Sequence, residues 1–194
     1  MSPYTIPCVL FAGGKSTRMG EDKSLLPFAH SQSLAQYQYE RLEEIFTHVY
    51  ISTKNTSKFD HINAKFIQDS LSPDVHAPTV GFINIFNQLH EENAVFVLSV
   101  DTPFVTKEVI KRLLEVKYVD YDAIIARTPS GIHPLCGIYT RALQEPMMDM
   151  IKNNDHKLTA LLKRSNVYYL DIEDEDLLMN LNTQDEYKKA LDKL

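Results

Sequence analysis

Short apolar runs recur along almost the whole chain, and polar or mixed segments separate them. Continuous stretches of apolar, β-branched and aromatic residues predict buried strands. These strands are expected at 6–12, 48–53, 64–68, 94–100, 122–126, 134–140 and 166–171. The run 94–100 (AVFVLSV) is the strongest of them, because every position but one is apolar.

The segments between these runs place apolar residues every three or four positions, which predicts amphipathic helices. The helices are expected at 33–46, 80–92, 106–117, 146–151, 156–164 and 183–194. Thr106 is a suitable N-cap, and Thr183 with Glu186 has the spacing of a capping box. Alternation of strands and helices predicts a three-layer α/β/α sandwich with a mainly parallel, Rossmann-like sheet, formed as a single domain over 1–194.

Composition narrows the function classes. The 194 residues are 44% hydrophobic and 24% charged, as in ordinary globular proteins, and the net charge is −6. An acidic chain has no general attraction for nucleic acid or for anionic membranes, so neither is expected as a partner. The start of the chain has no signal-peptide pattern and no apolar run approaches 18 residues, so we expect a cytoplasmic protein. Cys8 and Cys136 are expected to be buried thiols.

The loop behind the first strand concentrates glycines and cations. Three of the chain's six glycines lie at 13, 14 and 20, together with Lys15, Arg18 and Lys23. The letters GGKST suggest a P-loop, but the first glycine of that motif would have to stand at Val9, and a G-x-G-x-x-G motif also fails. Glycines that let backbone N–H groups approach a ligand, beside cations, predict a different phosphate-binding loop. A solvated basic turn is the alternative.

Asp101 follows the strongest strand directly, in VFVLSVDTPFV. A carboxylate at the carboxyl end of a buried parallel strand points toward the ligand crevice, where it can hold Mg²⁺ against nucleotide phosphates. The alternative is an aspartate that caps the next helix.

The stretch FAGGKSTRMGEDK (11–23) resembles the signature L-A-G-G-x-S-x-R-M-G-x-D-K of the molybdenum cofactor guanylyltransferases, which belong to the nucleotidyltransferases of GT-A-like (nucleotide-diphospho-sugar transferase) fold. Phe11 replaces the usual leucine. The adjacent glycines favour the guanylyl branch over relatives that read L-A-A-G. D-T-P at 101–103, H-P at 133–134 and N-L-N-T at 180–183 resemble further elements of this family. The family's G-P-L-A-G element is replaced here by the bulkier A-P-T-V-G at 77–81.

The resemblance implies roles for individual residues. The catalytic groups would be Arg18, Lys23 and Asp101, with Asp101 as the ligand of Mg²⁺. The nucleotide would be bound by Phe11, Ala12, Gly13, Gly14, Lys23, Asn55, Asp69, Gly81 and Asp101. The acceptor would be bound by His133, Asn180 and Asn182, for which a structural histidine and a turn before the last helix are the alternatives.

The resemblance also implies an activity. GMP would be transferred from GTP to a molybdopterin-type molybdenum cofactor, which gives the guanine dinucleotide cofactor and pyrophosphate. Candidate partners are molybdoenzymes and cofactor-insertion proteins. One alternative is a nucleotidyltransferase of the same fold that uses CTP or a sugar- or cobinamide-phosphate acceptor. Another is a non-catalytic module that delivers the cofactor.

Overall fold

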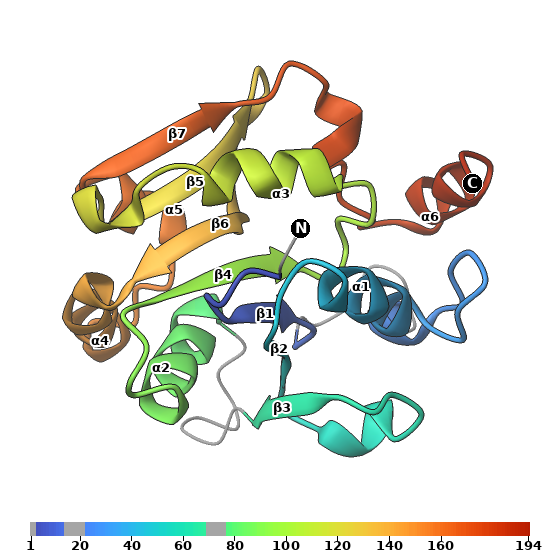
Figure 1. Ribbon diagram of the computed structural model, residues 1–194, viewed down its shortest axis with the longest axis horizontal. Coiled ribbons are helices and arrows are strands. Elements are labelled where there is room, and N and C mark those ends of the chain that lie inside the picture. Colours follow the sequence, from blue (N-terminus) through green and yellow to red (C-terminus); the bar gives the residue numbers. More distant parts are fainter. Residues whose placement is uncertain (1–2, 14–21, 69–76) are drawn as a thin grey trace.

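A seven-stranded sheet forms the centre of the molecule, with strand order β3-β2-β1-β4-β6-β5-β7 (Figure 1). The computed structural model describes residues 3–13, 22–68 and 77–194. Strand β6 pairs antiparallel with both β4 and β5, and the other neighbouring pairs are parallel. The predicted mainly parallel sheet is therefore confirmed.

The elements follow the predicted alternation, with ends that differ by a few residues. The strands are β1 (Cys8–Phe11), β2 (Val49–Thr53), β3 (Lys65–Gln68), β4 (Ala94–Ser99), β5 (Ala123–Thr128), β6 (Gly131–Thr140) and β7 (Val167–Asp171). The α-helices are α1 (Leu34–Glu43), α2 (Pro78–Gln88), α3 (Lys107–Leu114), α4 (Gln144–Lys152), α5 (Leu158–Lys163) and α6 (Gln184–Leu191). Short 3₁₀ turns are η1 (Lys23–Leu25), η2 (Thr56–Phe59), η3 (Tyr118–Asp120), η4 (Arg141–Leu143) and η5 (Glu175–Leu178).

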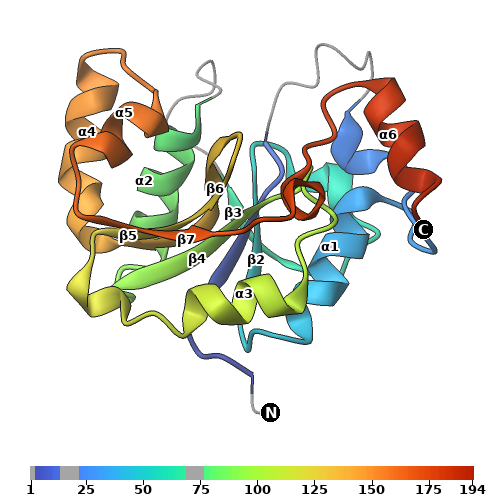
Figure 2. The same cartoon turned by 90° about the horizontal axis from the view of Figure 1, so that it is seen from above.

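Two hydrophobic cores cover the two faces of the sheet, because alternate residues of a strand point to opposite faces. Along β1, Cys8 and Leu10 face the core shared with α1 and α3, whereas Val9 faces the core shared with α2, α4 and α5. Figure 2 shows the sheet nearly edge-on with these two groups of helices on either side. The three-layer α/β/α sandwich is therefore confirmed.

Local signals in the sequence explain where several helices begin. The Thr106 side chain accepts from the backbone N–H of Val109 at the start of α3. Thr183 and Glu186 form the predicted capping box at the start of α6. Such caps each contribute about 1 kcal/mol to stability.

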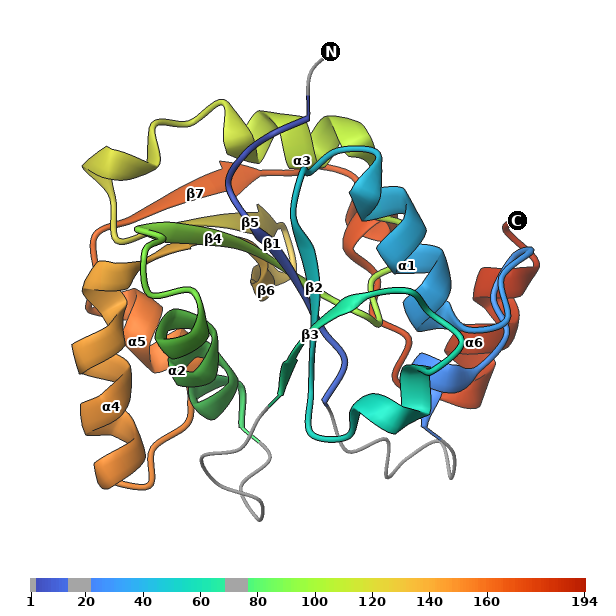
Figure 3. The same cartoon turned by 60° about the horizontal axis from the view of Figure 1, so that its bottom comes forward.

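Helix α2 packs alongside α4 on one face of the sheet (Figure 3).

The β5–β6 hairpin is tighter and longer than the sequence pattern predicts. The predicted strands 122–126 and 134–140 extend toward each other, so that only Pro129 and Ser130 lie between them. A register shift between Ile125 and Arg127 interrupts the pairing of the two strands. Polar residues such as Arg127 and His133 lie within the strands here, so the apolar pattern ends before the strands do. Within the described part of the chain, no helix is long and apolar enough to cross a membrane.

The order of the strands reverses beside β1. The chain runs outward through β1, β2 and β3, and then β4 returns to pair with the other side of β1. In open α/β sheets, ligands bind beyond the carboxyl ends of the strands at such a reversal. The carboxyl ends of β1, β2 and β4 therefore mark the edge where a ligand site is expected.

Candidate active site

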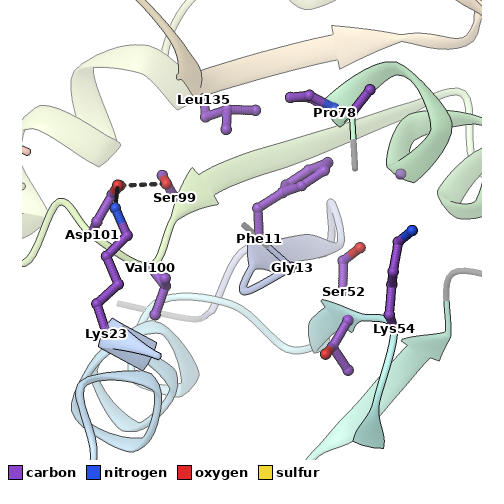
Figure 4. A pocket seen from close by; sticks show the side chains of 13 residues that line it. Phe11, Gly13, Lys23, Ser52, Lys54, Pro78, Ser99, Val100, Asp101 and Leu135 are labelled. Carbon is purple, nitrogen blue, oxygen red and sulfur yellow. Dashed lines mark hydrogen bonds and ion pairs between the residues drawn. The ribbon is translucent and has the colours of Figure 1, made fainter. Parts of the chain in front are cut away.

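Two adjoining cavities open at this edge of the sheet. The first, called here the β1 cavity, has a volume of about 210 Å³. It is lined by Phe11, Gly13, Lys23, Ser52, Thr53, Lys54, Ala77, Pro78, Gly81, Ser99, Val100, Asp101 and Leu135 (Figure 4). The second, the β6 cavity, has a volume of about 280 Å³. It is lined by Ser99, Asp101, Thr102, Ile132, His133, Pro134, Leu135, Cys136, Asn180 and Asn182.

Asp101 belongs to the lining of both cavities. The residue follows β4 and is only 9% exposed. One carboxylate oxygen accepts a hydrogen bond from the Ser99 hydroxyl, and the other forms an ion pair with Lys23. A nearly buried carboxylate with two partners has a fixed orientation, and it points to the position where two ligands in the two cavities would meet.

The Lys23 ammonium group lies among oxygen atoms. Besides Asp101, it donates to the backbone carbonyl of Leu181 at 3.2 Å and to the Asn182 side-chain oxygen at 3.4 Å. Carboxylate, carbonyl and amide oxygens are also the ligands that Mg²⁺ and Ca²⁺ prefer. This donor set therefore fits a hard divalent cation, with Asp101 as its charged ligand. In residues 3–13, 22–68 and 77–194 no three His, Cys, Asp or Glu side chains gather into a metal cluster.

The floor of the β1 cavity is apolar. The Phe11 ring packs against Phe82 with 5.2 Å between ring centroids. A side-chain carbon on Gly81 would come within 2.7 Å of the Phe11 ring, so the glycine makes room for that ring. Helix α2 begins next to it, with Pro78 at its first position, and directs its positive N-terminal end at the cavity.

The far end of the β1 cavity is formed by the carboxyl end of β2. Ser52, Thr53 and Lys54 line it there, and Figure 4 shows Lys54 on the opposite side of Phe11 from Lys23 and Asp101. The sequence prediction did not include these three residues, nor Ser99 and Leu135. The position of the first three at the carboxyl end of the strand predicted at 48–53 was an available signal, but the pairing of β2 beside β1 was not.

The β6 cavity contains the three residues predicted to bind the acceptor. The His133 ring and the Thr128 hydroxyl share a hydrogen bond of 3.0 Å. Burial lowers the pKa of His133 below the ordinary value, although the negative charge of Glu175 acts in the opposite direction. Asn180 and Asn182 line the same cavity and are exposed. All three therefore face the cavity that shares Asp101 with the β1 cavity.

The remaining predicted residues divide into three groups. Phe11, Gly13, Lys23, Gly81 and Asp101 line the β1 cavity. Ala12 is buried in the core shared with α1 and α3, and Asn55 is the N-cap of η2, where its side-chain oxygen accepts from the backbone N–H of Ser57. Gly14, Arg18 and Asp69 lie outside the described residues.

Fold and cavities together define a class: an α/β protein with cavities at the carboxyl edge of a mainly parallel sheet, lined by a nearly buried carboxylate and a lysine. The domain model of the MobA-like NTP transferases matches residues 8–168. The chain belongs to this family.

Named relatives agree with the match. The chain is 37% identical over 187 residues to a molybdenum cofactor guanylyltransferase of Campylobacter jejuni (strain RM1221), with 96% of each chain covered. It is 36% identical over 188 residues to a probable molybdenum cofactor guanylyltransferase of Aquifex aeolicus (strain VF5), covering 95% of this chain and 89% of the relative.

A solved structure supports the fold. The crystal structure of molybdopterin-guanine dinucleotide biosynthesis protein A from Archaeoglobus fulgidus superimposes with a TM-score of 0.81. The comparison covers 97% of this chain and 98% of the other, at 22% identity, and therefore shows the shared fold alone.

Proposed function

We propose that this protein transfers GMP from GTP to the terminal phosphate of a molybdopterin-type molybdenum cofactor, with release of pyrophosphate. The observation that supports this most strongly is the pair of cavities that share Asp101. A transfer reaction needs two anionic substrates held next to each other, and the two cavities supply adjoining places for them.

The nucleotide occupies the β1 cavity in this proposal. Its phosphates lie at the end formed by Lys23 and Asp101, because that end adjoins the β6 cavity and carries the Lys23 ammonium group. The base and ribose then lie over Phe11, toward Lys54 at the other end. The acceptor occupies the β6 cavity, where His133, Asn180 and Asn182 offer hydrogen-bonding groups to its phosphate.

The chemistry requires no covalent intermediate on the protein. An oxygen of the acceptor phosphate attacks the α-phosphorus of GTP in line, the bond to the β-phosphate breaks, and pyrophosphate leaves with its electron pair. Lys23 provides positive charge where negative charge develops on the phosphates.

Asp101 is the proposed ligand of Mg²⁺, and Asn182 and the Leu181 carbonyl are the neighbouring oxygens. When bound, the metal would neutralise phosphate charge and orient the phosphates. Lys23 would then exchange the Asp101 carboxylate for a phosphate oxygen.

The test is transfer of label from α-phosphate-labelled GTP to the molybdenum cofactor in the presence of Mg²⁺, with CTP and ATP in parallel. We expect a labelled dinucleotide and equimolar pyrophosphate with GTP, and almost none with the other two. Efficient transfer from CTP would replace this function by that of another nucleotidyltransferase of the same fold. Binding of cofactor without pyrophosphate release from any nucleotide would indicate a delivery module.

A further inference from the structure

The segment Val100–Val105 carries Asp101 and has no regular secondary structure. Val100, Asp101, Thr102, Pro103 and Val105 are nevertheless buried. Buried backbone carbonyls that belong to no helix or sheet need other hydrogen-bond donors. The position of Asp101 therefore depends on what supplies those donors.

Two side chains of helix α1 supply most of them. The Gln38 amide donates to the carbonyls of Thr102, at 3.0 Å, and of Val100, at 3.5 Å. The Arg41 guanidinium donates to the carbonyls of Pro103, at 2.5 Å, and of Val105, at 2.6 Å. Arg41 also donates to the Gln38 side-chain oxygen at 2.9 Å, which links the two side chains into one unit.

Gln38 is completely buried, so its two amide hydrogens and its oxygen cannot turn to water. A planar guanidinium presents its donors in a fixed fork, and here two of its nitrogens bind three acceptors. The Asp101 carbonyl is held from another side by the backbone N–H of Leu181, at 2.9 Å. Carbonyls on both sides of the carboxylate-bearing residue are thus fixed to α1.

We propose that Gln38 and Arg41 are positioning residues, which hold the segment 100–105 so that the Asp101 carboxylate stands in the geometry that metal and phosphates require. The expected effect on the kinetics of transfer rests on the proposed function. Neither side chain lines the β1 or the β6 cavity, so they act through Asp101. A displacement of about 1 Å at a reacting group can lower a rate about a hundredfold.

Arg141 offers a matched control at the other end of β4. Its guanidinium donates to the carbonyls of Phe86, Leu89 and Glu92, and it lies over the Phe86 ring at 5.2 Å. Arg41 lies in the same way over the Tyr37 ring, at 5.1 Å. Both arginines anchor backbone carbonyls at partly buried positions, but only Arg41 anchors the segment that carries Asp101.

The experiment compares Arg41→Met and Arg141→Met in the full chain, with Gln38→Met as a second variant in case Arg41→Met does not fold. Amide hydrogen exchange of the segment 99–106 is measured on the free protein. Steady-state transfer is measured against Mg²⁺ concentration at saturating GTP and acceptor, below the melting temperature of each variant.

Arg41→Met and Gln38→Met should increase exchange in 99–106, raise the KM for Mg²⁺ by about tenfold or more and lower kcat between about tenfold and a hundredfold. Arg141→Met should lower the melting temperature comparably and leave both kinetic constants within about twofold. Equal exchange in 99–106 for both arginine variants would overturn the proposal. So would faster exchange with unchanged KM for Mg²⁺ and kcat. Absence of transfer by the wild type would refute the proposed function instead, while the exchange data would still decide whether α1 holds the segment.

Discussion

At the scale of single residues, the proposed site contains a carboxylate, an ammonium group and an imidazole whose environments differ. Asp101 and Lys23 are paired and nearly buried, with side chains 12% and 16% exposed. His133 is half-buried and bonded to a hydroxyl. Each group is therefore restricted in position before any ligand arrives, and each should respond to substitution in its own way.

Lys23→Ala and Asp101→Ala should each lower the rate of transfer by about 10²–10³-fold, because each removes a charge that the proposed reaction uses. Circular dichroism and the melting temperature should show that both variants still fold. Lys58→Ala is the matched control, since Lys58 forms a comparable partly buried pair with Asp22 and lines neither cavity. Turnover of Lys23→Ala within tenfold of the wild type would remove this lysine from the mechanism.

His133 should make the stability of the protein depend on pH. Burial lowers its pKa below the ordinary value of 6.5, so the folded chain takes up a proton less readily than the unfolded chain. The stabilising contribution is therefore present above that value and declines as the pH falls through and below it. We expect the difference in free energy of unfolding between wild type and His133→Asn, from urea titrations, to shrink as the pH is lowered from 7.5 to about 5. A difference that grows on acidification would contradict the sign.

At the scale of elements, β1 and α2 form the floor of the β1 cavity together. Phe11 stands at the end of β1, and Gly81 in α2 leaves the space that its ring fills. The family resemblance identified both residues, but the sequence could not show that they touch. Their contact is a consequence of packing α2 against the sheet, which brings together residues 70 positions apart in the chain.

Gly81→Ala should displace the Phe11 ring toward the cavity, because the new methyl group would lie 2.7 Å from a ring carbon. We expect a KM for GTP raised by about tenfold, together with a loss of stability of about 1–3 kcal/mol as in other overpacked sites. Phe11→Leu, with its smaller side chain, should restore the KM in the double variant. If the two changes are simply additive, the two residues do not act through this contact.

The types of the elements could largely be predicted from the sequence. A continuous apolar run indicates a strand that is buried on both faces, and helical periodicity indicates a helix that is buried on one face. The extent of the two strands of the β5–β6 hairpin was harder to predict. The polar residue His133 lies within β6 and a register shift interrupts its pairing with β5, so the strands extend beyond the end of the apolar pattern. Lys54, Ser52 and Thr53 were missed for a related reason, because pairing of β2 beside β1 is a property of the folded sheet.

At the scale of the whole molecule, the order of the strands explains why residues from 11 to 182 surround one place. β1 and β4 are neighbours although 82 residues lie between Phe11 and Ala94, and the segment at 180–182 returns to the same edge. The net charge of −6 makes the local cations Lys23 and Lys54 more significant, since the overall field repels a polyanion. The family resemblance named eight of the residues that line the two cavities, and the sheet explains how they meet.

The central claim is that a nucleotide binds in the β1 cavity with its phosphates between Lys23 and Asp101. The most direct test is a crystal structure with a non-hydrolysable GTP analogue and Mn²⁺, whose anomalous scattering locates the metal. We predict the base over Phe11 on the Lys54 side, the phosphates at Lys23, and the metal bonded to the Asp101 carboxylate. A nucleotide bound elsewhere, or a metal away from Asp101, would contradict the account.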